Sequence, residues 1–124
     1  MRLKEFTMIL FILSSKPYDG SDNISGALRL VTKLVEMGED VKIFAISDAV
    51  DLVRAAAKKP ESYDIDLQEI IKKILALNVP IKACGTSLKR SGEYKNEPYL
   101  NEDIRGSMDL LASWTKEASK VLTY

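Results

Sequence analysis

Short apolar runs alternate with amphipathic helical patterns along this chain, and this alternation constrains the fold more than any other feature. The first run, residues 6–13 (FTMILFIL), is almost continuously apolar, as in a strand that is covered on both faces. Further strands are predicted at 41–46 (VKIFAI), 79–83, near Ile104 and at 120–124 (KVLTY). Strands that alternate with helices form parallel sheets. We therefore expect an α/β protein, a three-layer α/β/α sandwich around a mainly parallel sheet of about five strands.

Helical periodicity fills the gaps between the predicted strands. Apolar residues recur at the helical period after Ser21 or Asp22, either of which is expected to cap a helix that Gly38 ends. Asp66 and Glu69 form the start of a second helix that resembles a capping box. Further helical segments are predicted at 47–57, within 85–92, and after Ser107 as its cap.

Length and charge limit the classes of partner. A chain of 124 residues corresponds to a single domain, 1–124, because typical domains have about 150 residues. Eighteen Lys and Arg balance eighteen Asp and Glu, which argues against nucleic acid and anionic membrane surfaces as partners. No apolar run approaches the ~18 residues of a membrane span, so we expect no membrane association. A near-neutral surface also favours association with further copies of the chain.

Two residue counts limit the chemistry. The chain has no histidine, which removes Ser-His and Cys-His nucleophile pairs and histidine-ligated zinc. Its one cysteine, Cys84, forms no intramolecular disulfide or cysteine-based zinc site and fits a reducing, cytoplasmic compartment. Asp48 and Asp51 follow the second predicted strand, but two carboxylates provide too few oxygens for Mg²⁺ or Ca²⁺. We expect them to cap a helix, and we expect neither a metal nor a cofactor.

In open parallel sheets, ligands and reactive groups gather beyond the carboxyl ends of the strands. The segments 14–22, 47–51 and 84–92 each follow a predicted strand. They should therefore share one edge of the sheet, where we expect the functional site.

Cys84 is the main candidate for chemistry at this edge. It directly follows an apolar strand, and a Gly-Thr-Ser turn leads from it into a predicted helix. A thiol beside free helix N–H groups has a lowered pKa, and the thiolate is the form that attacks sulfane sulfur and holds it as a persulfide. The alternative is a buried cysteine that acts as a small hydrophobic residue. The residues expected to support Cys84 are Gly85, Thr86, Ser87, Lys89 and Arg90, the last two by their positive charge.

The loop SSKPYDGSDN, residues 14–23, is a second candidate. Its hydroxyls, its lysine and the N–H groups at a helix start resemble an anion cradle, although it matches neither GxGxxG nor GxxxxGK[ST]. The alternative is a capped turn between strand and helix. The residues expected to bind an anion or a partner are Ser14, Ser15, Lys16, Tyr18, Asp22 and Asn23.

Four sequence blocks occur in order along nearly the whole chain: YDGSDN (18–23), VKIFAISDAVDL (41–52), CGT (84–86) and GSMDL (106–110), before the closing KVLTY. Together they resemble the DsrE-like family of small sulfur-relay proteins, which includes DsrE- and TusD-type subunits. The resemblance implies a flavodoxin-like, parallel α/β sandwich that assembles into homotrimers, hexamers or hetero-oligomers.

The resemblance also implies a role for Cys84, which matches the cysteine that receives sulfur as a persulfide and hands it to the next carrier. Arg90 and Gly92 stand where such members often have an arginine and a glycine. Many relatives read Cys-Gly-Thr-Cys, whereas this chain has Ser87 at the fourth position. Without a second internal thiol, sulfur must pass to another subunit or protein.

These observations predict a small cytoplasmic sulfur-relay protein, similar to sulfurtransferases, that carries a persulfide on Cys84. We expect a homotrimer or homohexamer with a protein sulfur donor and a protein acceptor. The alternative is a non-catalytic oligomeric binding or scaffold module of the same fold, without sulfur transfer.

Overall fold

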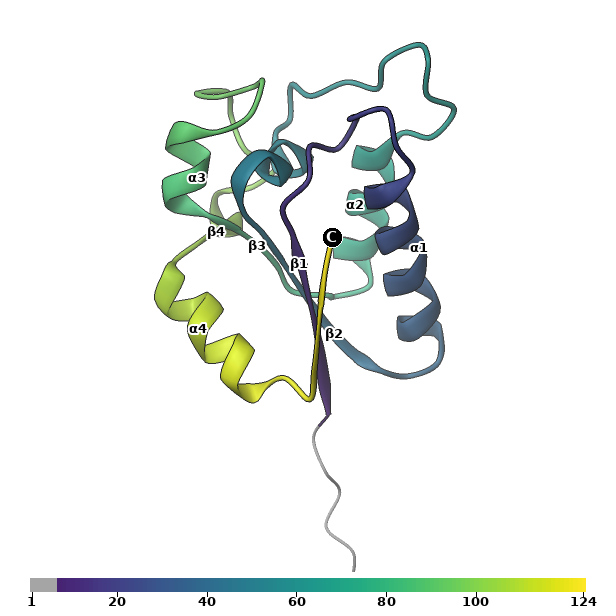
Figure 1. Ribbon diagram of the computed structural model, residues 1–124, viewed down its shortest axis with the longest axis vertical. Coiled ribbons are helices and arrows are strands. Elements are labelled where there is room, and N and C mark those ends of the chain that lie inside the picture. The colour runs from purple at the N-terminus through teal and green to yellow at the C-terminus, as the bar shows by residue number, and fades with distance from the viewer. Residues whose placement is uncertain (1–6) are drawn as a thin grey trace, which may run out of the picture.

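A five-stranded parallel sheet forms the centre of the protein (Figure 1). The computed structural model describes residues 7–124, so residue 6 of the predicted first strand lies outside the described residues. The strand order is β4-β3-β2-β1-β5. The predicted α/β sandwich is therefore confirmed. The strands are β1 (Met8–Leu13), β2 (Asp40–Ala45), β3 (Ile81–Cys84), β4 (Arg105–Gly106) and β5 (Lys120–Thr123).

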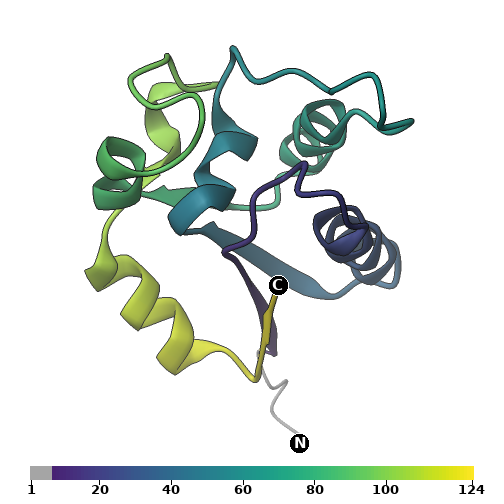
Figure 2. The same cartoon turned by 45° about the horizontal axis from the view of Figure 1, so that its top comes forward.

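Helices cover both faces of this sheet (Figures 1 and 2). Helices α1 (Asn23–Glu36) and α2 (Leu67–Ala76) lie on one face, and α4 (Met108–Glu117) lies on the other. From β1 to β4 the chain adds strands in one direction, and α4 then carries it back across the sheet to β5. Because crossovers between parallel strands are right-handed, a return in the opposite direction places α4 on the opposite face.

Strand β1 is covered on both faces, which explains why its sequence is apolar throughout. Phe11 and Leu13 pack in the core shared with α1 and α2, whereas Met8 and Leu10 pack on the other face with Trp114 of α4. Side chains alternate between the faces of a strand, so a strand covered on both sides has no position for an exposed polar residue. Each fully buried side chain of this kind contributes about 1.5–3 kcal/mol.

The predicted starts of α2 and α4 are confirmed. The Asp66 carboxylate accepts the N–H groups of Gln68 at 3.1 Å and Glu69 at 3.3 Å. The Ser107 hydroxyl accepts the Leu110 N–H at 3.1 Å. These bonds satisfy donors that the first turn of a helix otherwise leaves free.

Two other helix ends differ from expectation. Asp22 occupies the N-cap of α1, but its carboxylate pairs with Arg29 at 2.8 Å and makes no capping bond. The helix predicted at 47–57 is a 3₁₀ helix, η1 (Ser47–Val53). It ends before Arg54, because the backbone there turns to the extended region while the side chain enters the interior. As predicted, Gly38 ends the α1 region, and its backbone lies in the left-handed region with φ +83°.

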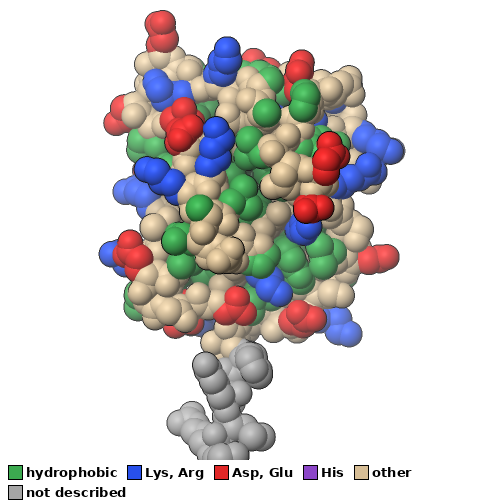
Figure 3. All heavy atoms as spheres, turned by 180° about the vertical axis from the view of Figure 1, so that it is seen from behind, with side chains coloured by type: hydrophobic (Ala, Val, Ile, Leu, Met, Phe, Trp, Pro, Cys, Tyr) green, Lys and Arg blue, Asp and Glu red, His purple; other side chains and the backbone are tan. Residues whose placement is uncertain are grey.

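The remaining elements are the short helices α3 (Gly85–Arg90) and η2 (Glu102–Ile104). Acidic and basic side chains are interspersed over the face seen in Figure 3, which agrees with the balanced charge. Among residues 7–124, none of the helices has the length and apolar character needed to cross a membrane.

Candidate functional site

The three segments predicted to share an edge of the sheet do meet there. The Ser47 N–H, after β2, donates to the Ser87 hydroxyl, after β3, at 2.9 Å. The Lys16 ammonium, after β1, lies 3.8 Å from the carboxylate of Glu93, just beyond the 84–92 segment. The carboxyl edge of the sheet is thus one continuous surface formed by segments distant in sequence.

Cys84 is the last residue of β3, and its side chain is 5% exposed. It faces the side of the sheet that α4 covers. In most of its surroundings, Cys84 therefore resembles a small residue buried in a core. Its apolar neighbours in this cluster are Met8, Leu10, Phe44, Leu111 and Trp114.

Cys84 nevertheless borders a surface hollow of about 220 Å³. One wall is the turn that begins α3, and the other is the segment from β4 into α4. Met108, on that second wall, is 61% exposed. The lining residues of this hollow are Cys84, Gly85, Thr86, Arg105, Gly106, Ser107 and Met108.

The local environment favours the thiolate. Burial raises the pKa of the Cys84 thiol, but hydrogen bonds from the Ser87 N–H, the Ser87 hydroxyl and the Thr86 N–H outweigh burial and lower the pKa below its usual value. Cys84 is the N-cap of α3, where the N–H groups of the first helical turn have no partner within the helix. An ionised sulfur gives these donors a strong acceptor, and this favours the thiolate.

The charges expected beside Cys84 are elsewhere. Lys89 and Arg90 lie at the end of α3, and a helix rises about 1.5 Å per residue, so the chain carries them away from the sulfur. Lys89 lines a different hollow, near Arg54. The expectation that these two charges lower the thiol pKa is wrong, because hydrogen bonds do so. The guanidinium that borders the hollow belongs to Arg105, whose Nε would lie 2.8 Å from a Cβ added to Gly85.

Most polar groups of the 14–23 loop are bonded within the fold. The Ser14 hydroxyl donates to the Tyr124 carbonyl at 3.1 Å, the Asn23 amide donates to Ser15 at 3.0 Å, and Asp22 pairs with Arg29. These contacts describe a structured turn. Anion binding by Ser14, Ser15, Asp22 and Asn23 stays a prediction.

Lys16 and Tyr18 line a second hollow, of about 430 Å³. Among the described residues, it shares no lining residue with the hollow of Cys84. The two candidates predicted at this edge of the sheet therefore lie at two separate hollows.

Asp51 was expected to cap a helix, and this expectation is wrong. The carboxylate is 3% exposed and accepts the N–H groups of Glu93 at 2.8 Å and Tyr94 at 3.2 Å. Gly92, with φ +94°, makes room for it, since an added Cβ would lie 2.3 Å from Asp51 Oδ1. Asp51 thus anchors the loop that follows α3.

Arg54 is a buried residue beside α3 that the sequence did not indicate. It is 1% exposed, and its guanidinium donates to the carbonyl of Leu88 and, at 2.8 Å, to that of Glu97. The guanidinium also lies 5.4 Å from the centre of the Tyr99 ring. Arg54 therefore fixes the end of α3. The sequence does not indicate this role, because the partners of Arg54 are backbone carbonyls and not acidic side chains.

Comparison with known proteins gives consistent results. Residues 8–124 match the DsrE/DsrF-like family. The chain is 34% identical over 118 residues to Protein YchN of Escherichia coli, covering 94% of this chain and 97% of that protein. It is 32% identical over 120 residues to an uncharacterised protein of Methanopyrus kandleri, covering 94% of this chain and 93% of the other. The crystal structure of the E. coli ychN protein has a TM-score of 0.80 at 32% identity, covering 95% of this chain and 99% of that one.

Proposed function

Because the chain belongs to the DsrE/DsrF-like family, which is generally related to sulfur relay, we propose that it carries sulfur as a persulfide on Cys84. One observation carries this proposal. A thiol whose pKa is lowered lies at the start of α3 and borders a hollow that opens to the surface. Membership alone does not supply the activity, since unrelated functions occur on one fold.

The proposed step is a transfer of sulfane sulfur. The Cys84 thiolate attacks the outer sulfur of a donor persulfide, forming a new S–S bond as the donor S–S bond breaks and the donor leaves as a thiolate. Cys84 then holds the outer sulfur with its proton as a persulfide. An acceptor thiolate attacks that outer sulfur in turn and regenerates the Cys84 thiolate, so no external oxidant or reductant is consumed.

The side chains around Cys84 support this step. The Ser87 hydroxyl and the N–H groups of Thr86 and Ser87 stabilise the attacking and the leaving thiolate of Cys84. Arg105 puts a positive charge at the rim, where an anionic donor group would approach.

Donor and acceptor are proposed to be other proteins, because Cys84 is the chain's one cysteine. We propose a homotrimer or homohexamer that works in the cytoplasm. Exposed apolar side chains support self-association: Met108 at the rim of the hollow is 61% exposed, and Val121 on the edge strand β5 is 40% exposed.

Transfer of labelled sulfur tests the proposal. The protein is incubated with a cysteine desulfurase and cysteine carrying radioactive sulfur, then separated without reductant. We expect label on the wild-type chain that a reductant removes, and none on Cys84→Ser. Label of equal amount on Cys84→Ser, or none on a folded wild-type chain, would overturn the proposal.

The second candidate is a binding or scaffold module without sulfur transfer. The 5% exposure of Cys84 among apolar side chains favours it. It predicts that Cys84→Ser keeps folding, assembly and cellular function, whereas the persulfide proposal predicts loss of function with folding intact.

A further inference from the structure

The hollow of about 430 Å³ is formed by three segments that meet only in the folded protein. They are the loop after β1, the stretch from η1 to α2, and the loop after α3. Its volume lies in the range of about 300–1,000 Å³ that is usual for small-molecule sites. Because it shares no described residue with the hollow of Cys84, whatever occupies it is separate from the proposed sulfur chemistry.

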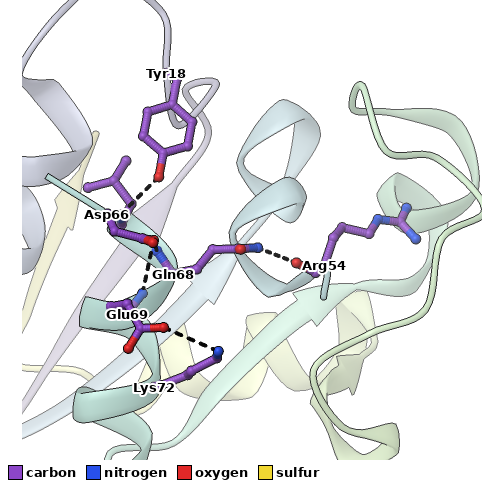
Figure 4. A network of polar contacts seen from close by, with 7 residues as sticks. Tyr18, Arg54, Asp66, Gln68, Glu69 and Lys72 are labelled. Carbon is purple, nitrogen blue, oxygen red and sulfur yellow. Dashed lines mark hydrogen bonds and ion pairs between the residues drawn. The ribbon is translucent and has the colours of Figure 1, made fainter. Parts of the chain in front are cut away.

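Its inner wall holds two buried polar side chains with different roles. Asp51 is already satisfied by two loop N–H groups. Gln68 is 8% exposed, and its Nε2 donates to the carbonyl of Arg54 (Figure 4). Within residues 7–124 the structure shows no donor for Gln68 Oε1. Because Gln68 lines the hollow, this oxygen can accept a hydrogen bond from a ligand that carries a donor.

The walls of the hollow are aromatic and apolar. Tyr18, labelled in Figure 4, is held in place because its hydroxyl accepts the Leu67 N–H at 2.9 Å and its ring packs edge-on against Tyr63 with centroids 4.9 Å apart. Leu52 and Ala57 add apolar surface. A rigid wall of this kind suits a flat ring, since little side-chain entropy is lost on binding.

The rim is positively charged. Lys16 is paired with Glu93, but Lys58 has no anionic partner among the described residues, and Lys59 donates to the Tyr63 carbonyl at 2.6 Å and not to an acid. Lysine ammonium groups at the mouth of an apolar pocket attract a ligand that carries a negative charge.

We propose that this hollow binds a small aromatic anion that carries a hydrogen-bond donor on its ring. The ring lies against Tyr18 and Leu52, the ring donor bonds Gln68 Oε1, and the anionic group lies at Lys58 and Lys59. An aminobenzoate and an adenine mononucleotide share this chemistry, and the experiment distinguishes them.

Isothermal titration calorimetry with two matched pairs of ligands tests the proposal. The pairs are para-aminobenzoate with benzoate, and adenosine monophosphate with purine riboside monophosphate, which lacks the amino group. In at least one pair, the aminated ligand is expected to bind about tenfold more tightly than its partner. The pair in which the aminated ligand binds more tightly shows whether the hollow prefers an aminobenzoate or an adenine mononucleotide. Equal binding within both pairs, or no binding of any of the four, overturns the proposal.

A matched pair of variants locates the site. Lys58→Glu is expected to weaken binding of the preferred ligand by about tenfold. Lys89→Glu makes the same change of charge on an exposed residue of a different hollow, and binding is expected to stay at the wild-type value. Both side chains are exposed, so folding is preserved in each. Equal effects of the two variants would show non-specific attraction and overturn the proposed position.

Discussion

Removal of the Ser87 hydroxyl is expected to make Cys84 less reactive at neutral pH. This hydroxyl accepts the Ser47 N–H at 2.9 Å, so its own proton remains available for the Cys84 sulfur. Burial raises the thiol pKa, and the hydroxyl is one of the donors that lower it against burial. In Ser87→Ala the hydroxyl is lost while the backbone N–H groups of residues 86 and 87 remain, so the variant isolates one hydrogen bond.

The size of the effect follows from that bond. A hydrogen bond to a charged group is worth about 1.5 kcal/mol at the lower end of its range, which corresponds to about a tenfold fall in the thiolate fraction below the pKa. The more basic thiolate is intrinsically about threefold more nucleophilic, given a Brønsted coefficient of about 0.45. At neutral pH, Ser87→Ala should therefore react about threefold more slowly. At a pH where both proteins are fully ionised the order should reverse.

Alkylation with iodoacetamide, followed by intact mass, measures this rate, and every adduct reports Cys84 because the chain has one cysteine. Thr86→Ala is the matched control, since only the backbone of Thr86 bonds the sulfur. The Ser47 N–H loses its acceptor in Ser87→Ala, which costs about 1 kcal/mol of stability, so rates are compared well below the unfolding transition. Equal rates at neutral pH, or no reversal at high pH, would refute the reasoning.

Three further predictions concern stability. Gly92→Ala should lower the free energy of unfolding by more than about 2 kcal/mol, because the added Cβ would meet Asp51. Gly20 also has a positive φ but has open space around it, so Gly20→Ala should lower that free energy by only about 1 kcal/mol. Equal losses of the two variants in urea denaturation would contradict the close contact at Gly92. Arg54→Met should cost at least about 2 kcal/mol by leaving two carbonyls without donors, and a loss below about 0.5 kcal/mol would contradict its role. Because the folded pKa of Cys84 is lowered, its thiolate adds stability that is present above the unfolded pKa and is lost as the pH falls through the folded pKa. The stability difference between the wild type and Cys84→Ser, measured by thermal denaturation, should therefore rise from neutral to alkaline pH. A decrease of this difference over the same pH range would contradict the lowered pKa.

The fold could be predicted because its signals are local and repeated. A parallel strand buried on both faces is an apolar run, so the second strand was expected at 41–46 and lies at Asp40–Ala45. Asp66 identified the start of α2 because its carboxylate bonds N–H groups two and three residues away. Such short-range chemistry is visible in a single sequence.

The details of the site could not be predicted because their contacts are distant in sequence and involve the backbone. Asp51 bonds N–H groups more than forty residues away, and Arg54 bonds two carbonyls, so neither has a partner side chain to identify it. Arg105 belongs to a strand of two residues, too short for any periodicity. The charge beside Cys84 was therefore assigned to Lys89 and Arg90, which are nearer in sequence but at the far end of α3.

Intact mass spectrometry after exposure to a persulfide donor tests sulfur carriage most directly. Wild-type protein, treated with cysteine desulfurase and cysteine and kept free of reductant, should gain the mass of one sulfur atom, and dithiothreitol should remove it. Cys84→Ser should gain nothing under the same conditions. An unchanged wild-type mass, with the desulfurase shown to load a known acceptor in the same tube, would contradict the role of Cys84 as a sulfur carrier.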